Sequence, residues 1–368
     1  MIVAKLHQVE YAIIQLCYLP PQSNYFSTHS TRPIYRFSLM SKRKLSKQQK
    51  SRIEENQRRE LKENGSDGQS AKENYNGRVV SHYGQHLDVE TLDPDSPRRV
   101  IRCSQRANLP SLVTGDLVVW DEDDSGAGVI LARGQRSNAF GRHDSNGVLR
   151  PAAANIDRVL VVFASEPIPH LNLIDRYLVA IENLDLQPLL ILNKIDLLGL
   201  DNQQALDNIL SIYEEIGYKP HRVSALSGTG VAELRAELQG LTTVLVGQSG
   251  VGKSSLLNYI GGEELAEVGG LSEARNKGTH TTTTSKLFHL ANFDLIDSPG
   301  IREFNLDFVS AESVFDGFVE FAPFKGLCKF RDCAHQSEPG CALLAAVEDG
   351  TVRQCRLDSY YRILSADD

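Results

Sequence analysis

The sequence has little that would suit a membrane-bound or secreted protein. Among its 368 residues no run approaches the roughly 20 apolar residues of a membrane helix. Its six cysteines are too sparse for the disulfide framework of a secreted domain. The apolar patch at Tyr11–Leu19 contains Gln15 and has only Lys5 and His7 before it, which disfavours a signal peptide. We therefore expect no membrane span and a cytoplasmic location.

The sequence also lacks an excess of positive charge, since its net charge is −8. This total hides an uneven distribution. Residues 1–63 carry twelve Lys and Arg against five Glu, a local charge of +7, so the remaining 305 residues sum to −15. The basic residues are concentrated in 42–63, a polar arm that is not expected to fold by itself. Contact with nucleic acid is therefore compatible with the acidic total.

The first 39 residues differ from the rest of the chain. Residues 11–39 contain no acidic side chain, which is compatible with a transit peptide, whereas Met40 is followed directly by the basic arm. We prefer a translation start at Met40, with 1–39 as an upstream or non-native extension, and a start at Met1 stays open. Residues 40–76 are then a flexible basic arm and linker, because Asn64–Asn76 is rich in Gly, Ser and Asn.

The next three segments predict three folded domains. Residues 77–155 contain five short runs of strand-forming residues between turn signals, which favours an OB-fold β-barrel and fits an SH3-like barrel almost as well. In 156–309, apolar strands alternate with amphipathic helices, which predicts a parallel α/β sheet covered on both faces. Residues 310–368 are mostly helical around a cluster of Cys and His.

A phosphate-binding loop follows the strand TTVLV. The sequence GQSGVGKS matches G-x-x-x-x-G-K-[ST] and opens the apolar helix SSLLNYI, the context that this motif requires. Backbone N–H groups of such a loop surround phosphate oxygens, Lys253 supplies charge, and the Ser254 hydroxyl is a Mg²⁺ ligand. The predicted phosphate-binding residues are Gly247, Gln248, Ser249, Gly250, Val251, Gly252, Lys253, Ser254 and Ser255.

The sequence NKID at 193–196, after the strand PLLIL, predicts guanine specificity. The carboxylate of Asp196 accepts bonds from guanine N1–H and the exocyclic amine, donors that adenine lacks at those positions. Asn193 and Lys194 complete the motif. Ser224 and Ala225 follow another strand, where a backbone N–H is predicted to reach the guanine O6.

Two further motifs predict the hydrolytic machinery. In DSPG, Asp297 is expected to hold Mg²⁺ through water and the Gly300 N–H to meet the γ-phosphate. In the threonine-rich segment 278–284, Thr282 is the predicted Mg²⁺ and γ-phosphate ligand. Ile301 occupies the position where many GTPases have a water-orienting Gln, so His280 is the candidate for polarising the attacking water. The predicted catalytic set is His280, Lys253 and Thr282.

The order of these motifs is unusual, because the base-binding motifs at 193–196 and 224–225 precede the phosphate-binding loop. A parallel sheet tolerates such a circular permutation, since every loop stays at the same edge of the sheet. One consequence is that DSPG runs directly into the C-terminal segment. There, Cys328, Cys333, His335 and Cys341 lie within 14 residues and form a complete tetrahedral set for one structural Zn²⁺.

From Met40 to its end the chain resembles the RsgA family of circularly permuted, zinc-containing GTPases. The resemblance rests on the basic arm, RCSQRANLPSLVTGDLVVW, NKID before GQSGVGKS, GTHTTT, DSPGIREF and the C-x₄-C-x-H-x₅-C tail. It implies a GTP hydrolase (EC 3.6.1.-) that acts late in assembly of the 30S ribosomal subunit, is stimulated by that subunit and leaves on hydrolysis. It also implies GTP or GDP, Mg²⁺ and Zn²⁺ as ligands and His280 as the catalytic histidine.

The expected partners are the 30S subunit and its 16S rRNA, and the expected oligomeric state is a monomer. Two other functions fit part of the sequence. A P-loop kinase or ATPase is opposed by NKID, because that motif selects guanine. A zinc and OB RNA-binding module with a regulatory or degenerate nucleotide site is opposed by the complete set of Lys253, Ser254 and Asp297.

Overall fold

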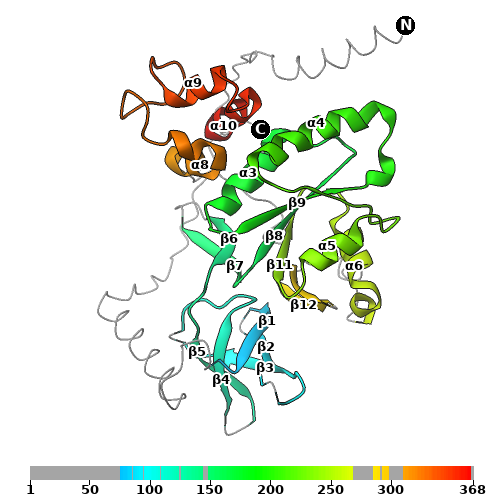
Figure 1. Cartoon of the computed structure of the whole chain (residues 1–368). Coiled ribbons are helices and arrows are strands. Elements are labelled where there is room, and N and C mark those ends of the chain that lie inside the picture. Colours follow the sequence, from blue (N-terminus) through cyan, green and yellow to red (C-terminus); the bar gives the residue numbers. More distant parts are fainter. Residues whose placement is uncertain are drawn as a thin grey trace, which may run out of the picture. The chain divides into compact units, whose positions relative to one another are not determined.

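The computed structural model describes residues 75–84, 86–93, 95–107, 109–123, 126–143, 148–267, 285–290, 292–297 and 310–365. All of them belong to one compact unit, Gln48–Asp368 (Figure 1). Within this part of the chain, no helix is both long enough and apolar enough to cross a membrane.

A closed five-stranded barrel forms the N-terminal part of the described chain. Its strands are β1 (Gly77–Tyr83), β2 (His86–Thr91), β3 (Val100–Gln105), β4 (Leu117–Glu122) and β5 (Gly128–Arg133). They pair in the order β1-β2-β3-β5-β4, and β4 pairs back onto β1, which closes the barrel. Buried apolar residues of these strands, among them Val79, Leu87 and Ile130, meet inside the barrel. The five predicted strands and the OB-fold are confirmed.

A hairpin that the sequence did not predict follows the barrel. It consists of β6 (Ala139–His143) and β7 (Leu149–Ala154). The sequence signal is weak because β7, LRPAAA, has no β-branched or aromatic residue and contains Pro151. The register shifts between Phe140 and Gly141, and a Cβ at Gly141 would lie 2.7 Å from the Cα of Pro151. Only glycine therefore allows this close approach.

A six-stranded sheet forms the centre of the molecule, in the order β10-β9-β8-β11-β13-β12. Its strands are β8 (Arg158–Ala164), β9 (Gln187–Asn193), β10 (His221–Arg222), β11 (Thr242–Val246), β12 (Lys286–Leu290) and β13 (Phe293–Asp297). All neighbouring pairs are parallel except β12 with β13. The predicted parallel sheet is confirmed. Strand β12, which the sequence did not predict, also pairs with β1 of the barrel, so the central strands and the barrel strands form one continuous sheet.

Helices cover both faces of this sheet, because its strands are apolar on both sides. They are α3 (Leu171–Glu182), α4 (Leu200–Ile216), α5 (Val231–Glu237) and α6 (Lys253–Glu267), with a short 3₁₀ helix, η1 (Ile195–Leu197) (Figure 1). Along β8, Val159 and Val161 pack towards α3 and α4. Leu160 and Val162 pack on the other face, in one cluster with residues of α5 and α6. The continuous apolar strands thus bury two separate cores.

The C-terminal part of the chain consists of α8 (Ala311–Gly317), η3 (Val319–Phe324), α9 (Ala342–Glu348) and α10 (Gln354–Ser365). Ser310 caps α8, since its side chain accepts from the Ser313 N–H at 3.1 Å. The core of this part is aromatic, with the rings of Phe318 and Phe321 stacked at 4.8 Å between centroids. Val179 of α3 belongs to the same core, so these helices pack on the central domain.

Candidate nucleotide and metal sites

The phosphate-binding loop connects the end of β11 to the start of α6 in the middle of the sheet. All three of its glycines have positive φ, 141° at Gly247, 84° at Gly250 and 88° at Gly252, which side-chain-bearing residues rarely adopt. A Cβ at Gly247 would also collide with the Val162 carbonyl oxygen, and one at Gly252 with the Asn193 amide. The backbone of the loop therefore lies directly against Val162 of β8 and Asn193 of β9, where only glycine fits.

The polar residues of the loop are accessible, whereas its apolar residue is not. Gln248, Ser249 and Gly250 are exposed, while Val251 is buried in the core below the loop. The Nζ atom of Lys253 donates to the carbonyl oxygens of Gly247 at 2.6 Å and Gln248 at 2.5 Å, so its ammonium group lies within the loop. Ser254 and Ser255 occupy the first turn of α6, with Ser254 half-buried and Ser255 exposed.

Asn193, at the end of β9, joins the phosphate loop to the second base-binding loop. Its side chain is buried, with 1 % exposed. The Nδ2 atom donates to the Val251 carbonyl at 3.0 Å, and the Oδ1 atom accepts from the Ala225 N–H at 3.1 Å. The Ala225 N–H, one candidate for the predicted bond to guanine O6, is thus directed at Asn193 here. The Asn of the NKID motif acts as a bridge between loops, a role that the linear motif did not reveal.

Asp196 is presented at the same edge of the sheet, in η1. It is exposed, and the Ser224 hydroxyl donates to its Oδ1 in a short hydrogen bond. Ser224 Oγ also accepts from the Leu226 and Ser227 N–H groups, at 3.2 and 3.1 Å. The serine therefore orients the carboxylate and leaves its second oxygen for an incoming donor.

Lys194 precedes this turn in a left-handed conformation, with φ of 62°. Its Nζ donates to the Glu166 carbonyl at 3.3 Å, and its own carbonyl accepts from Ser165 Oγ at 2.6 Å. The NKID segment is thereby held to the end of β8 as well as to the phosphate loop.

Asp297 ends β13, which runs parallel to β11, so the carboxylate lies at the same edge as the phosphate loop. The predicted residues His280, Thr282 and Gly300 lie outside the described residues. Of the predicted nucleotide-binding set, the described members all lie at the carboxyl ends of β9, β10, β11 and β13 or in the segments that follow them. This is the arrangement that parallel strands give to a ligand site at their carboxyl ends.

The four predicted metal ligands come together in the C-terminal part. The ligand atoms of Cys328, Cys333, His335 and Cys341 all lie within 4.8 Å of one another. A tetrahedral zinc site has bonds of about 2.3 Å to sulfur and 2.0–2.1 Å to nitrogen, so two sulfurs lie about 3.8 Å apart and sulfur and nitrogen about 3.6 Å apart. The structure has 3.8 Å between the Cys328 and Cys341 sulfurs, and 3.6 and 3.3 Å from these to His335 Nδ1. The donor set fits one tetrahedral ion.

Neighbouring residues orient these ligands. The His335 ring stacks on Phe315 at 5.1 Å between centroids, and Tyr361 donates its hydroxyl proton to the His335 carbonyl. The Leu344 N–H donates to Cys341 Sγ at 3.5 Å. Such supporting contacts fix ligand orientation in metal sites. Close to the cluster, Nζ of Lys325 is paired with Oδ1 of Asp316 at 2.7 Å, which offsets its positive charge.

Comparisons with known proteins agree with this geometry. A sequence model of the family described as RsgA GTPase matches residues 133–307. The "Small ribosomal subunit biogenesis GTPase RsgA" of Pseudomonas fluorescens strain Pf0-1 is 48% identical over 337 residues, which cover 89% of this chain and 98% of that protein. The chain belongs to the RsgA GTPase family. The equally named protein of Hahella chejuensis is 48% identical over 334 residues, 88% of this chain and 96% of its own.

Two solved structures have the fold of this RsgA family member. YjeQ from Thermotoga maritima matches with a TM-score of 0.65 and 30% identity, over 79% of this chain and 97% of that chain. YloQ, described as a circularly permuted GTPase, matches with a TM-score of 0.63 and 28% identity, over 79% and 93%. The fold class predicted from the order of the motifs, with an OB barrel, a permuted GTPase domain and a helical zinc-type tail, is confirmed.

Proposed function

We propose that this RsgA family member hydrolyses GTP as an assembly factor of the small ribosomal subunit, the role for which its relatives are named. The observation that carries the proposal is the connected geometry at one edge of the sheet. Asn193 bonds to both the phosphate loop and the Ala225 loop, and Ser224 orients Asp196 beside them. Base recognition and phosphate binding are thereby parts of one hydrogen-bonded site.

Guanine is selected by Asp196. Its free carboxylate oxygen and Oδ1 accept the N1–H and amine protons of guanine, two charge-assisted bonds that adenine cannot form. The substitution Asp196→Asn replaces one acceptor by an N–H donor, which opposes the guanine amine and matches the oxygen that xanthine carries there. We expect the variant to lose GTP turnover and to gain turnover of xanthosine triphosphate. A variant that still prefers GTP would contradict the assignment.

The phosphates are held by Gly247–Ser255, with Lys253 supplying positive charge. Bound Mg²⁺ neutralises charge that develops on the phosphates during hydrolysis, and Ser254, Thr282 and Asp297 are the residues proposed to hold it. We assign to His280 the polarisation of the attacking water, because Ile301 is apolar. His280→Ala is expected to keep GTP binding and to lose stimulated hydrolysis.

We propose Zn²⁺ as the ion of the cluster formed by Cys328, Cys333, His335 and Cys341. Three thiolates and one imidazole complete a tetrahedral shell, which leaves no open position for catalysis. The ion therefore stabilises a segment whose own apolar core is small. DSPG leads along the chain into this C-terminal segment. A change from GTP to GDP can therefore alter the position of the segment.

The partners that we propose are the 30S subunit and its 16S rRNA, bound in the GTP state and released on hydrolysis. The basic arm 42–63 supplies charge for phosphate contacts. The protein then acts as a monomer in the cytoplasm.

The decisive experiment is GTP turnover of the full chain with and without 30S subunits across a salt series. We expect stimulation by the subunits that weakens as salt rises, since arm contacts with phosphate are electrostatic. Lys253→Ala is the control for nucleotide-dependent turnover. Absence of turnover above background with subunits present would instead favour an RNA-binding module with a degenerate nucleotide site.

A further inference from the structure

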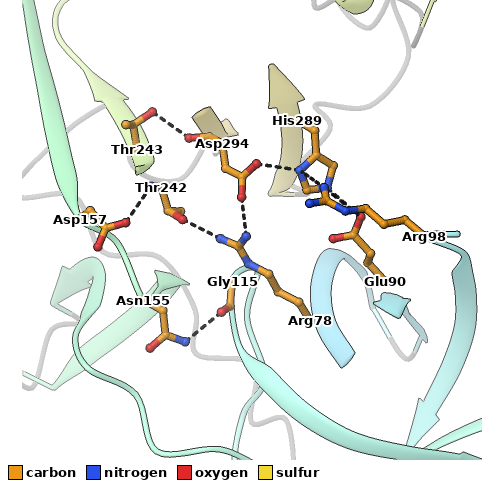
Figure 2. Close-up of polar contacts among 10 residues, drawn as sticks. All are labelled: Arg78, Glu90, Arg98, Gly115, Asn155, Asp157, Thr242, Thr243, His289 and Asp294. Carbon is orange, nitrogen blue, oxygen red and sulfur yellow. Dashed lines mark hydrogen bonds and ion pairs between the residues drawn. The ribbon is translucent and has the colours of Figure 1, made fainter. Parts of the chain in front are cut away.

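A group of ion pairs joins the barrel to the hairpin formed by β12 and β13 (Figure 2). His289 and Asp294 face each other across this hairpin, and His289 Nδ1 lies 2.7 Å from Asp294 Oδ1. The other carboxylate oxygen, Oδ2, accepts from Nη1 of Arg78 on β1 at 2.5 Å. The Nη2 atom of Arg78 donates to Thr242 Oγ1, at the start of β11, at 2.8 Å. One barrel arginine thus contacts both the hairpin and the strand that carries the phosphate loop.

The second nitrogen of His289 contacts the barrel directly. Its Nε2 atom lies 2.9 Å from Oε1 of Glu90 on β2, whose side chain is only 5 % exposed. A neutral imidazole has one N–H, so donation to carboxylates on both sides requires the protonated ring. Hydrogen bonds with Asp294 and then Glu90 raise the pKa of His289 to about 9. Arg98, with Nη1 3.2 Å from His289 Nδ1, opposes protonation, but its side chain is 68 % exposed and also faces Glu90 at 3.8 Å.

The barrel also holds the opposite end of the same hairpin. The hydroxyl of Thr114, a fully buried residue, donates to the Ser285 carbonyl at 3.0 Å. Ser81 of β1 pairs with Lys286, which in turn pairs with Asp297. In the sequence, Ser285 directly follows the threonine segment 278–284, and Asp297 begins DSPG. The threonine segment 278–284 and DSPG, here called the switch segments, therefore leave the sheet beside Ser285 and Lys286, which barrel residues hold.

We propose that Thr114, Arg78, Glu90, His289 and Asp294 are positioning residues for GTP hydrolysis. This inference rests on the proposed function. None of the five belongs to the nucleotide site, so they act through the hairpin: they fix the ends of both switch segments relative to the phosphate loop. A ligand bound to the barrel then biases hydrolysis through the same contacts, which makes the barrel a regulatory domain as well as a binding domain.

The test uses the full chain with Thr114→Val and His289→Gln. Thr114→Val keeps the β-branched shape and removes only the hydroxyl that holds Ser285, and His289→Gln removes the charge between the carboxylates. Arg102→Gln is the matched control, because Arg102 forms a barrel ion pair with Asp88 at 3.0 Å and lies on β3, a strand that pairs with β2 and β5 and not with the hairpin. Single-turnover GTP hydrolysis is measured together with titration of fluorescent GDP.

We expect hydrolysis about tenfold slower in both variants, because small displacements of catalytic groups are costly, and GDP affinity within about twofold of the parent chain. The control should match the parent chain. The ratio of parent to His289→Gln rates should be largest near neutral pH and approach one as pH rises through about 9, where the parent histidine loses its proton.

Unchanged rates in both variants, with an active parent chain, would overturn the inference and leave the proposed function intact. A loss of hydrolysis that accompanies equal losses of GDP affinity and barrel folding would also overturn it, since the residues would then be structural only. A parent chain that hydrolyses no GTP in any condition would count against the proposed function itself.

Discussion

A buried arginine attaches the C-terminal helices to the central domain, and its removal should be unusually costly. Arg356 of α10 is 1 % exposed. Its Nη1 donates to Asp175 of α3, a carboxylate with no exposed surface, and its Nε donates to Glu320 of η3 at 2.5 Å. The guanidinium also lies 4.5 Å from the centre of the Phe318 ring. The guanidinium group of Arg356 therefore balances the negative charge of two carboxylates.

The substitution Arg356→Met keeps most of the apolar stem but leaves both carboxylates without their cation. Removing one partner of a buried ion pair costs about 3–5 kcal/mol. Burial already raises the pKa of Asp175 even with the arginine present. Without the arginine, the Asp175 carboxyl should bind a proton at still higher pH. The loss of stability caused by Arg356→Met should therefore be largest near pH 7 and shrink as pH falls.

Hydrogen exchange of the α10 amides measures this effect locally, which is useful because a multidomain chain need not unfold in one step. A loss of 3–5 kcal/mol corresponds to exchange about 10²- to 10⁴-fold faster. The matched control is Arg353→Met, since Arg353 directly precedes α10 but pairs with Glu215 at the surface, where both side chains are about half exposed. We expect that exposed pair to contribute about 1 kcal/mol or less.

The double substitution Arg356→Met with Asp175→Asn should recover part of the protection, because it removes the orphaned charge. If Arg356→Met changed α10 exchange no more than Arg353→Met does, the buried pair would not be what holds these helices, and the reasoning would be refuted.

Three further outcomes follow from the site and its surroundings. His289, which has a raised pKa and is 35 % exposed, should stabilise the barrel junction by ~1–2 kcal/mol after solvent screening. The difference in unfolding free energy between the parent chain and His289→Gln should be complete below about pH 6.5 and vanish as pH rises through about 9. Urea unfolding followed by Trp120 fluorescence measures this difference. Asn193→Ala, which orphans the Val251 carbonyl, should weaken GDP binding about tenfold in a fluorescence titration. Metal chelation should speed amide hydrogen exchange in residues 328–341 and leave the barrel amides protected. Equal exchange with and without chelator would contradict a bound ion.

The local motifs of this protein could be read from the sequence because each depends on residues that are close together in the chain. The glycines at 247, 250 and 252 are where φ is positive, and NKID follows a strand whose centre is continuously apolar. Three strands were not predicted, β6, β7 and β12, and each is defined by the neighbouring strands that pair with it. Their stability comes from tertiary contacts, which no local pattern reports.

The sequence by itself determined the permuted order of the nucleotide motifs and the spacing of the metal ligands. It also distinguished the short strand-forming runs of the barrel from the alternating apolar strands and amphipathic helices of the α/β sheet. Only the tertiary structure decided which distant charges meet. Arg78 and Asp294 are 216 residues apart, and Arg356 and Asp175 are 181 apart, yet each pair shares a hydrogen bond. The physical reason is that an ion pair across domains depends on how packed surfaces align, whereas a phosphate loop or a metal-binding turn depends on the conformation of a few consecutive residues.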